Sequence, residues 1–320
     1  MALFGNKVVK FNGIDFIPIS NLTKKEFDEY YIPMDFEIKM VWQMNYTYIM
    51  TSENAQKSHY YKIVNDMLCI FQKYHKGLAM LCFPIGKCNS KKMFDTLKEC
   101  FDIMVKCSES KYQVRIDWVN QQQIDFVGAD KIKASKMIDK KSECKDYVYD
   151  PYMVSCMEGS DYRYIRRKIN KFDRDYPNAI IREYEDKDYP QMQALADEWK
   201  HYVKEEVGRY DWLVDANYYK NTLLHHKELD HKVFVCELDG KIIGMVSGGM
   251  LIDGEYAWCF NRKPLNQYDG LSEKLVWFIC DFFKDATYLN DGSGSSGLSF
   301  FKERFRPVYE NLLYVVNGMK

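Results

Sequence analysis

The run QYDGLS at residues 267–272 lies between a predicted strand and the start of a predicted helix. The first backbone N–H groups of a helix lack partners within it and carry partial positive charge, so they attract phosphate oxygens. A glycine there lets a ligand approach the backbone closely. The candidate cofactor-binding residues are therefore Gln267, Tyr268, Gly270, Leu271 and Ser272. A purely structural turn before the helix is the alternative.

A second candidate is a basic amphipathic helix predicted over residues 160–175. Its apolar positions Tyr162, Ile165, Ile169 and Phe172 recur at helical spacing. Residues 159–174 hold six basic and two acidic side chains, a local charge of +4. Such a strip suits a phosphate-rich donor, either the nucleotide of a coenzyme or the acceptor end of a transfer RNA, whereas a solvated surface helix is the alternative. The candidate donor-contacting residues are Arg163, Arg166, Arg167 and Lys171.

The third candidate is the C-terminal run NDGSGSSGLSFFKERFRP at 290–307. A glycine-rich loop entering a helix with Lys302, Arg304 and Arg306 beside two phenylalanines suits an anion or a substrate channel, and a connector is the alternative. Asp291 lies near a strand end and is a candidate base or orienting group. Lys302 is a candidate for stabilising developing negative charge or holding donor phosphate. We take Asp291 and Lys302 as the candidate catalytic residues.

Metal and redox chemistry have no motif in this chain. The ten cysteines include no CxxC pair, and the six histidines form no HxH or HExxH pattern. Several cysteines sit in apolar runs such as MLCIF and WFIC, which predicts small buried thiols. No metal cofactor is expected.

The elements that must position these residues repeat one order in both halves. In the first half, two runs around Asn65-Asp66 predict a hairpin over 58–74. A strand at 78–86, a helix over 90–107 opened by Ser90, and a strand at 112–119 then predict a βαβ unit. The charged segment 129–145 is the candidate boundary. The run DYVYD at 146–150 is expected to end the first domain's sheet.

The second half shows clearer signals. A strand at 179–185 and helices over 189–206 and 216–229 precede a hairpin around Asp239-Gly240. A strand at 255–263 then leads into a helix over 271–284, and a strand, a short helix and a last strand follow. The predicted fold class is α+β, with two domains of mixed sheets flanked by helices over 1–150 and 151–320.

Composition excludes several broad classes of protein. A chain of 320 residues with net charge −1 is neither a uniformly basic nucleic-acid coat nor an acidic tail, and DNA is not an expected partner. The N-terminus shows no secretory signal, and no stretch approaches the length of a membrane span. A cytoplasmic location without stable membrane insertion is expected, and the oligomeric state is left open.

A series of landmarks carries a resemblance to one bacterial family. They run from about residue 37 to the C-terminus and comprise FPIGK at 83–87, DYVYD, MEGSDYRYIRRKINKF at 157–172 and GLSFFKERFRP at 297–307. Together they resemble the phosphatidylglycerol lysyltransferase C-terminal-domain-like proteins. The 267–272 loop also resembles the pyrophosphate loop of GCN5-related N-acetyltransferases (GNAT), with Ser272 in place of the last small residue.

The resemblance implies two tandem GNAT-like domains and the transfer of an acyl or aminoacyl group. The family's helix arginine falls on Arg166 and its last-motif lysine on Lys302. Its neighbouring Lys and Asn are Ile165 and Arg167 here, and its acidic loop is reduced to Asp291. The membrane-spanning half of the lysyltransferases has no counterpart in this sequence, so lipid aminoacylation does not follow from the resemblance.

Two functions remain open at this point. One is an acyl- or aminoacyltransferase that uses acyl-CoA (coenzyme A) or aminoacyl-tRNA as donor and an amine or hydroxyl as acceptor, by direct transfer. The other is a non-catalytic ligand-binding or regulatory protein that keeps the fold, because a fold does not carry function by itself.

Overall fold

The computed structural model describes residues 8–109, 113–134, 137–206, 212–252, 255–294 and 296–318. The chain forms two compact units, one of Met1–Lys145 with Asn311–Lys320 and one of Asp146–Glu310. The sequence places a single division at residue 150 and assigns the C-terminal end to the second domain. The difference arises because the last strand pairs with a strand of the first unit.

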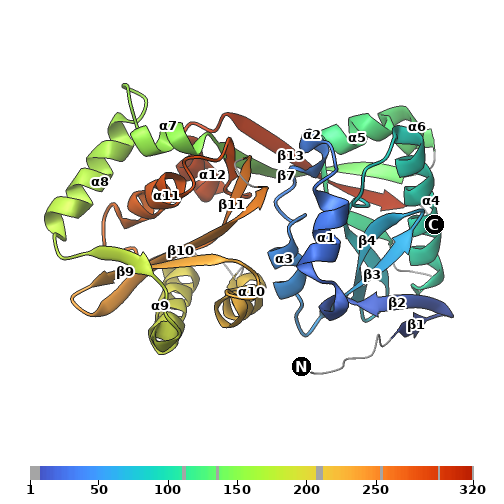
Figure 1. Cartoon of the computed structure of the whole chain (residues 1–320), viewed down its shortest axis with the longest axis horizontal. Helices are drawn as coiled ribbons and strands as arrows, with labels where there is room; N and C mark the ends of the chain where they lie inside the picture. The colour runs from blue at the N-terminus through green and yellow to red at the C-terminus, as the bar shows by residue number, and fades with distance from the viewer. Residues whose placement is uncertain are drawn as a thin grey trace. The chain divides into compact units, whose positions relative to one another are not determined.

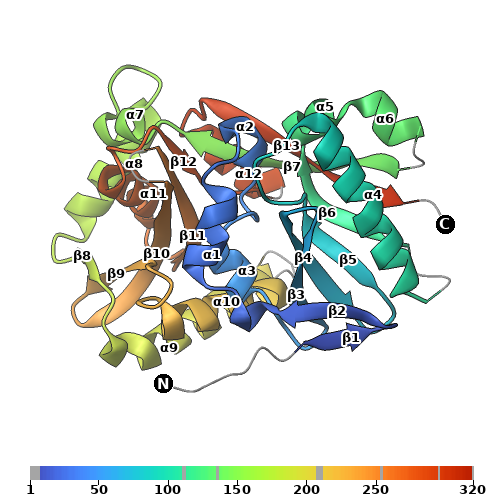
Figure 2. The same cartoon turned by 45° about the vertical axis from the view of Figure 1, so that its right-hand side comes forward.

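The first unit is built on a mixed sheet (Figure 2). Its strands in spatial order are β1 (Val9–Phe11), β2 (Ile14–Pro18), β3 (Lys57–Val64), β4 (Met67–Tyr74), β5 (Leu78–Cys82), β6 (Arg115–Asn120) and β13 (Tyr309–Gly318). Neighbours are antiparallel except β5 and β6, which run parallel. A parallel pair needs a crossover, and α4 (Ser90–Lys106) provides it, which confirms the predicted βαβ unit.

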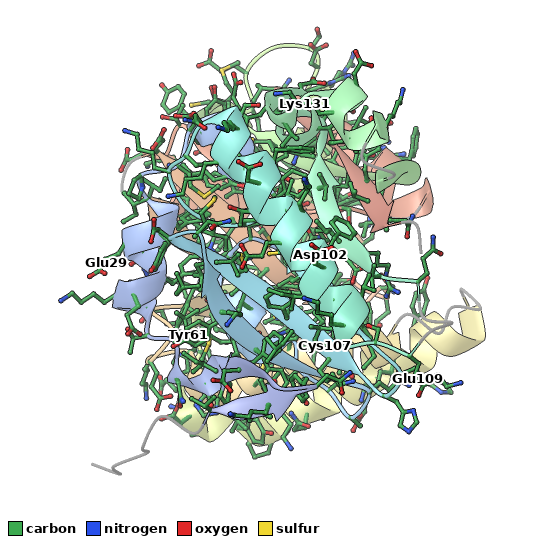
Figure 3. All side chains as sticks on the ribbon, turned by 90° about the vertical axis from the view of Figure 1, so that its right-hand side faces the viewer. Glu29, Tyr61, Asp102, Cys107, Glu109 and Lys131 are labelled. Atoms are coloured by element: carbon green, nitrogen blue, oxygen red, sulfur yellow. The ribbon has the colours of Figure 1, made fainter. Side chains whose placement is uncertain are left out.

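Helix α4 crosses one face of this sheet, with Asp102 on its outer side (Figure 3). Met93, Leu97 and Met104 on its inner side are almost fully buried, as the helical spacing predicts. The side chain of Asn89 accepts from the Lys92 N–H, so Asn89 is the N-cap and the predicted Ser90 is the first helical residue.

The remaining helices of the first unit are short. They are η1 (Ile19–Asn21), α1 (Lys24–Tyr31), α2 (Phe36–Lys39), α3 (Tyr46–Thr51), α5 (Gln121–Val127) and α6 (Ala129–Ala134). The predicted hairpin is present, because Val64 pairs with Met67 across Asn65 and Asp66. Both turn residues have positive φ, 49° and 55°, as a two-residue turn between twisted strands requires.

The second unit repeats the same plan. Its strands in spatial order are β8 (Ile180–Glu183), β9 (Lys232–Leu238), β10 (Lys241–Ile252), β11 (Tyr256–Pro264), β12 (Tyr288–Asn290) and the end of β7 (Met137–Tyr149). Only β11 and β12 run parallel among these described pairs, and α11 (Leu271–Phe282) makes their crossover. The hairpin at Asp239-Gly240 is confirmed.

Helices cover both faces of this second sheet. Figure 1 shows α11 and α8 (Arg163–Asp175) on one side of β10 and β11, and α9 (Tyr189–Glu206) and α10 (Trp212–His225) on the other. Helix α10 lies four residues earlier than the predicted 216–229. The shorter elements are α7 (Pro151–Cys156), η2 (Asp186–Asp188) and α12 (Ser296–Glu303).

The run DYVYD is placed differently from the expectation. Val148 and Tyr149 pair with Asn290 and Leu289 of β12, and the second unit begins at Asp146, so this end of β7 lies in the sheet of the second unit. The predicted α+β fold class, with mixed sheets flanked by helices, is confirmed. In the described part of the chain, every helix is too short or too polar to cross a bilayer.

Candidate functional site

A buried cluster of charges forms where β11, β12 and α12 meet in the second unit. Arg262 on β11 donates from Nη1 to both carboxylate oxygens of Asp291, at 3.1 and 3.3 Å. Lys302 Nζ on α12 lies 3.4 Å from Asp291 Oδ2. The side chains of Asp291 and Lys302 are each 4% exposed. The structure thus brings the two predicted catalytic residues together and adds Arg262, which the sequence analysis missed.

Lys302 is bound by the loop that it follows. Its Nζ donates to the carbonyl oxygens of Asp291, Gly292 and Ser293, the last two at 3.1 Å. An ammonium group has three hydrogens, so these carbonyls and the Asp291 carboxylate already account for all of them. Lys302 therefore holds the start of the glycine-rich loop and has no hydrogen left for a reacting oxygen.

Asp291 remains ionised inside this cluster. Burial by itself raises its pKa, but Arg262 and Lys302 together lower that pKa below its ordinary value. Tyr149 OH lies 3.4 Å from Asp291 Oδ2 and 3.2 Å from the Lys302 carbonyl oxygen, and burial raises the pKa of this phenol well above its usual value. The buried carboxylate of Asp146 also acts electrostatically on Lys302, so two carboxylates offset the two cations in a nearly dry site.

Arg262 is the member of the cluster that has donors to spare. A guanidinium carries five N–H groups, and within the described residues only Nη1 of Arg262 has acceptors. Its side chain is 10% exposed, more than that of either partner. The cluster can therefore present an oriented N–H fork to an oxyanion, with Asp291 fixing the guanidinium.

The glycine loop packs closely against α8. Gly270 has φ +91°, and a Cβ there would stand 2.3 Å from the Lys168 carbonyl oxygen of α8. Position 270 therefore requires a glycine, because α8 lies close to the start of α11. The carboxylate of Asp269 in this loop forms ion pairs with Lys168 at 2.5 Å and with Lys171 at 3.4 Å.

The other predicted cofactor-binding residues point to different neighbours. Gln267 donates to Glu198 at 2.9 Å, and the ring of Tyr268 packs against Tyr176. Leu271 is fully buried in the core, and Ser272 is partly buried. The side chains of Gln267, Tyr268 and Leu271 are thus engaged inside the protein, and a phosphate at this helix start would contact backbone N–H groups.

Helix α8 has the predicted amphipathic form. Its apolar stripe of Tyr162, Ile165, Ile169 and Phe172 is buried, as expected. The four candidate basic residues on it behave differently: Arg166 donates to the Met157 carbonyl oxygen, and Lys171 is bound to Asp175 and Asp269.

Two arginines of this helix remain available. Arg163 and Arg167 are exposed, one turn apart, and neither has a partner in the described part of the chain. Arg163 and Arg167 are therefore the two candidates that can contact a donor phosphate without breaking an existing bond.

On the opposite face of β11, two ionisable side chains are buried that the sequence analysis did not single out. Lys263 is 3% exposed, and its Nζ lies 3.8 Å from the ring centroid of Trp199. His231 packs against Trp258 and Phe260, and burial lowers its pKa to about 3. Among the residues that the structure describes, His, Cys, Asp and Glu form no cluster that could hold a metal ion.

Comparison with solved structures gives distant relatives of the same fold. A conserved protein of unknown function from Bacteroides thetaiotaomicron has 17% identity and a TM-score of 0.76, covering 95% of this chain and 99% of its own. L-PGS from Bacillus licheniformis has 15% identity and a TM-score of 0.58, covering 82% of this chain and 84% of its own.

A third structure is the C-terminal domain (DUF2156) of a proposed lysylphosphatidylglycerol synthetase from Agrobacterium fabrum. It has 13% identity and a TM-score of 0.58, covering 83% of this chain and 85% of its own. Comparison with curated proteins gives no match. The family described as phosphatidylglycerol lysyltransferase, C-terminal, matches residues 46–317, and the chain therefore belongs to this family.

Proposed function

We propose that this protein is an aminoacyltransferase that moves an aminoacyl group from aminoacyl-tRNA to an amine or hydroxyl by direct transfer. Membership of the phosphatidylglycerol lysyltransferase C-terminal family supports the reaction class. The observation that carries the choice of donor is the contrast between two sites. The Lys168 carbonyl lies where a side chain at position 270 would stand, whereas Arg163 and Arg167 are exposed and unengaged among the described residues.

The chemistry is nucleophilic attack on an ester. The acceptor's nitrogen or oxygen bonds to the aminoacyl carbonyl carbon, the bond from that carbon to the ribose oxygen breaks, and the acceptor's proton ends on the ribose oxygen. Negative charge develops on the carbonyl oxygen in the transition state. The free N–H groups of Arg262 suit that charge, because burial strengthens their field and Asp291 holds the guanidinium in place.

This assignment changes the roles first expected of the two candidate catalytic residues. Asp291 is a positioning residue for Arg262, and Lys302 is a positioning residue for the loop at 291–293. Their own polar atoms are satisfied inside the protein. Arg262 takes the role of the group that contacts the reacting oxygen.

One observation favours the second candidate function, a ligand-binding or regulatory protein without catalysis. Two of its three members are satisfied internally, with Lys302 fully bound and Asp291 shared among three partners. A charge cluster of this kind also serves simply to join strands and a helix in a folded core.

Transfer measured with labelled aminoacyl-tRNA separates these candidates. We expect the label to leave the RNA for a lysine- or glycerol-bearing acceptor, and Arg262→Lys to slow that transfer without loss of RNA binding. Stabilisation by aminoacyl-tRNA in a thermal-shift titration, and not by acetyl-CoA or CoA, supports the choice of donor. RNA binding without transfer favours the non-catalytic function, and stabilisation by acetyl-CoA alone contradicts the proposed donor.

A further inference from the structure

An arginine of the second unit lies over two aromatic rings. The guanidinium carbon of Arg304 is 4.4 Å from the ring centroid of Tyr164 on α8 and 4.6 Å from that of Phe300 on α12. Both rings are therefore within stacking distance of the cation. This Tyr164–Arg304–Phe300 stack joins two elements that are far apart in the sequence.

Phe300 forms the open end of the stack. Its side chain is 60% exposed, the highest value among the large apolar residues of the described chain. Its neighbours Phe301 and Phe305 contact each other in the interior, so the helix already has its core anchors. Phe300 is thus not needed as a core anchor, and its contact in the unit is with the Arg304 guanidinium.

The stack has positive charges beside it. Arg163 and Arg167 occupy positions one residue before and three residues after Tyr164 on α8, and both are exposed without a partner in the described residues. The carboxylate of Asp269, in the loop before α11, is already paired with Lys168 and Lys171 of α8. An anionic partner is favoured over a neutral or cationic one.

We infer that the stack is a platform for an unpaired base of the RNA donor, with phosphates held by Arg163 and Arg167. Stacked aromatic and arginine planes beside cations are the usual surface for single-stranded nucleic acid. A bilayer-binding surface differs, because it separates an apolar face from a charged one, whereas rings and guanidinium groups alternate here. This inference rests on the proposed function and adds to it the residue that receives a base.

The test compares two RNA minihelices that differ in one feature. One carries a four-nucleotide 3′ overhang and the other ends blunt, and binding to the full chain is measured by fluorescence anisotropy. Because one more base stacks on the platform, we expect the overhang to tighten binding about tenfold, which corresponds to about 1.4 kcal/mol. Phe300→Ala removes this preference and Phe300→Trp keeps it.

Two further variants separate stacking from charge. Ile180→Ala removes another exposed apolar side chain of the same unit and leaves the preference unchanged. The double change Arg163→Gln and Arg167→Gln weakens binding of both RNAs and reduces the salt slope by about 2, because two phosphate contacts are lost. A salt slope equal to that of the unchanged chain contradicts the phosphate contacts.

The outcomes also separate this inference from the proposed function. If the unchanged chain transfers an aminoacyl group but Phe300→Ala keeps the overhang preference, the platform is wrong and the function stands. If the chain binds neither RNA but Phe300 is required for sedimentation with vesicles containing phosphatidylglycerol, the surface docks on lipid and the platform is wrong. If the platform behaves as expected while transfer fails, the inference stands and catalysis does not.

Discussion

Replacing Asp291 by asparagine tests the buried cluster most directly. The change keeps the shape of the side chain but removes the charge that compensates Arg262 at 3.1 Å and Lys302 at 3.4 Å. The side chains of both cations are 10% exposed or less, so water cannot replace the lost partner. Removing one partner of a buried ion pair costs about 3–5 kcal/mol, and here two cations are left.

The expected result is a loss of about 3–5 kcal/mol in the free energy of unfolding. For a unit of this size, that corresponds to a fall in Tm of about 6–20 °C. Urea denaturation followed by circular dichroism measures the free energy, and calorimetry measures Tm. The double variant Asp291→Asn with Arg262→Met should regain part of the loss, because one uncompensated cation is then absent.

A matched control uses a carboxylate at the surface. Asp173 bonds to Lys274 at 2.9 Å but is 49% exposed, so Asp173→Asn should change stability by less than about 1 kcal/mol. If Asp291→Asn also costs less than 1 kcal/mol, the three charged groups are not coupled in a dry site. The role assigned to Asp291, holding the Arg262 guanidinium, would then be refuted as well.

Three further predictions follow from single residues. Gly270→Ala should lower the free energy of unfolding by about 2–4 kcal/mol, because a positive φ and a backbone clash both oppose the new methyl group. Gly240 also has a positive φ but open space around it, so Gly240→Ala should lower that free energy by only about 1 kcal/mol. Urea denaturation of both variants measures the difference. Burial lowers the pKa of His231 to about 3 and that of His59 to about 4 in the folded chain. The free energy of unfolding should therefore fall as the pH drops below about 6.5, because these histidines then bind protons in the unfolded chain but stay neutral in the folded one. At pH 5 the loss is about 2 kcal/mol for each histidine, and His231→Phe should flatten the measured slope while a slope unchanged by it contradicts the argument. Arg262→Lys should lower kcat for aminoacyl transfer about 100-fold with little change in KM, since the charge remains but the N–H fork is lost; a raised KM with kcat unchanged would point to donor binding instead.

The sequence alone was sufficient where the deciding energies are local. The hairpins at Asn65-Asp66 and Asp239-Gly240 follow from residues that tolerate positive φ, and the structure has 49°, 55°, 48° and 84° at these positions. The buried stripe of α8 follows from helical spacing in the same way. The family resemblance was also visible in the sequence, because its landmarks are spread over most of the chain.

Tertiary structure decided which of the candidate residues can act. Gly270 is predicted from the sequence to admit a ligand, and the structure adds that the Lys168 carbonyl lies where its side chain would stand. Lys302 looked like a free cation, but three carbonyl oxygens bind it. Arg262 carried no signal, because a single arginine in a strand reveals its carboxylate only after the strand and the loop at Asp291 have met.

The same limit explains the strands at the two unit boundaries. The local apolar pattern predicts a strand at Tyr149 and at Leu313, but it does not identify the partner of either residue. Their partners, Leu289 and Asn120, lie far away in the sequence, so the choice depends on which sheet edge is open when the chain folds. The amino-acid sequence determined the elements and the family, whereas long-range packing determined the partners of each strand and the residues left free for chemistry.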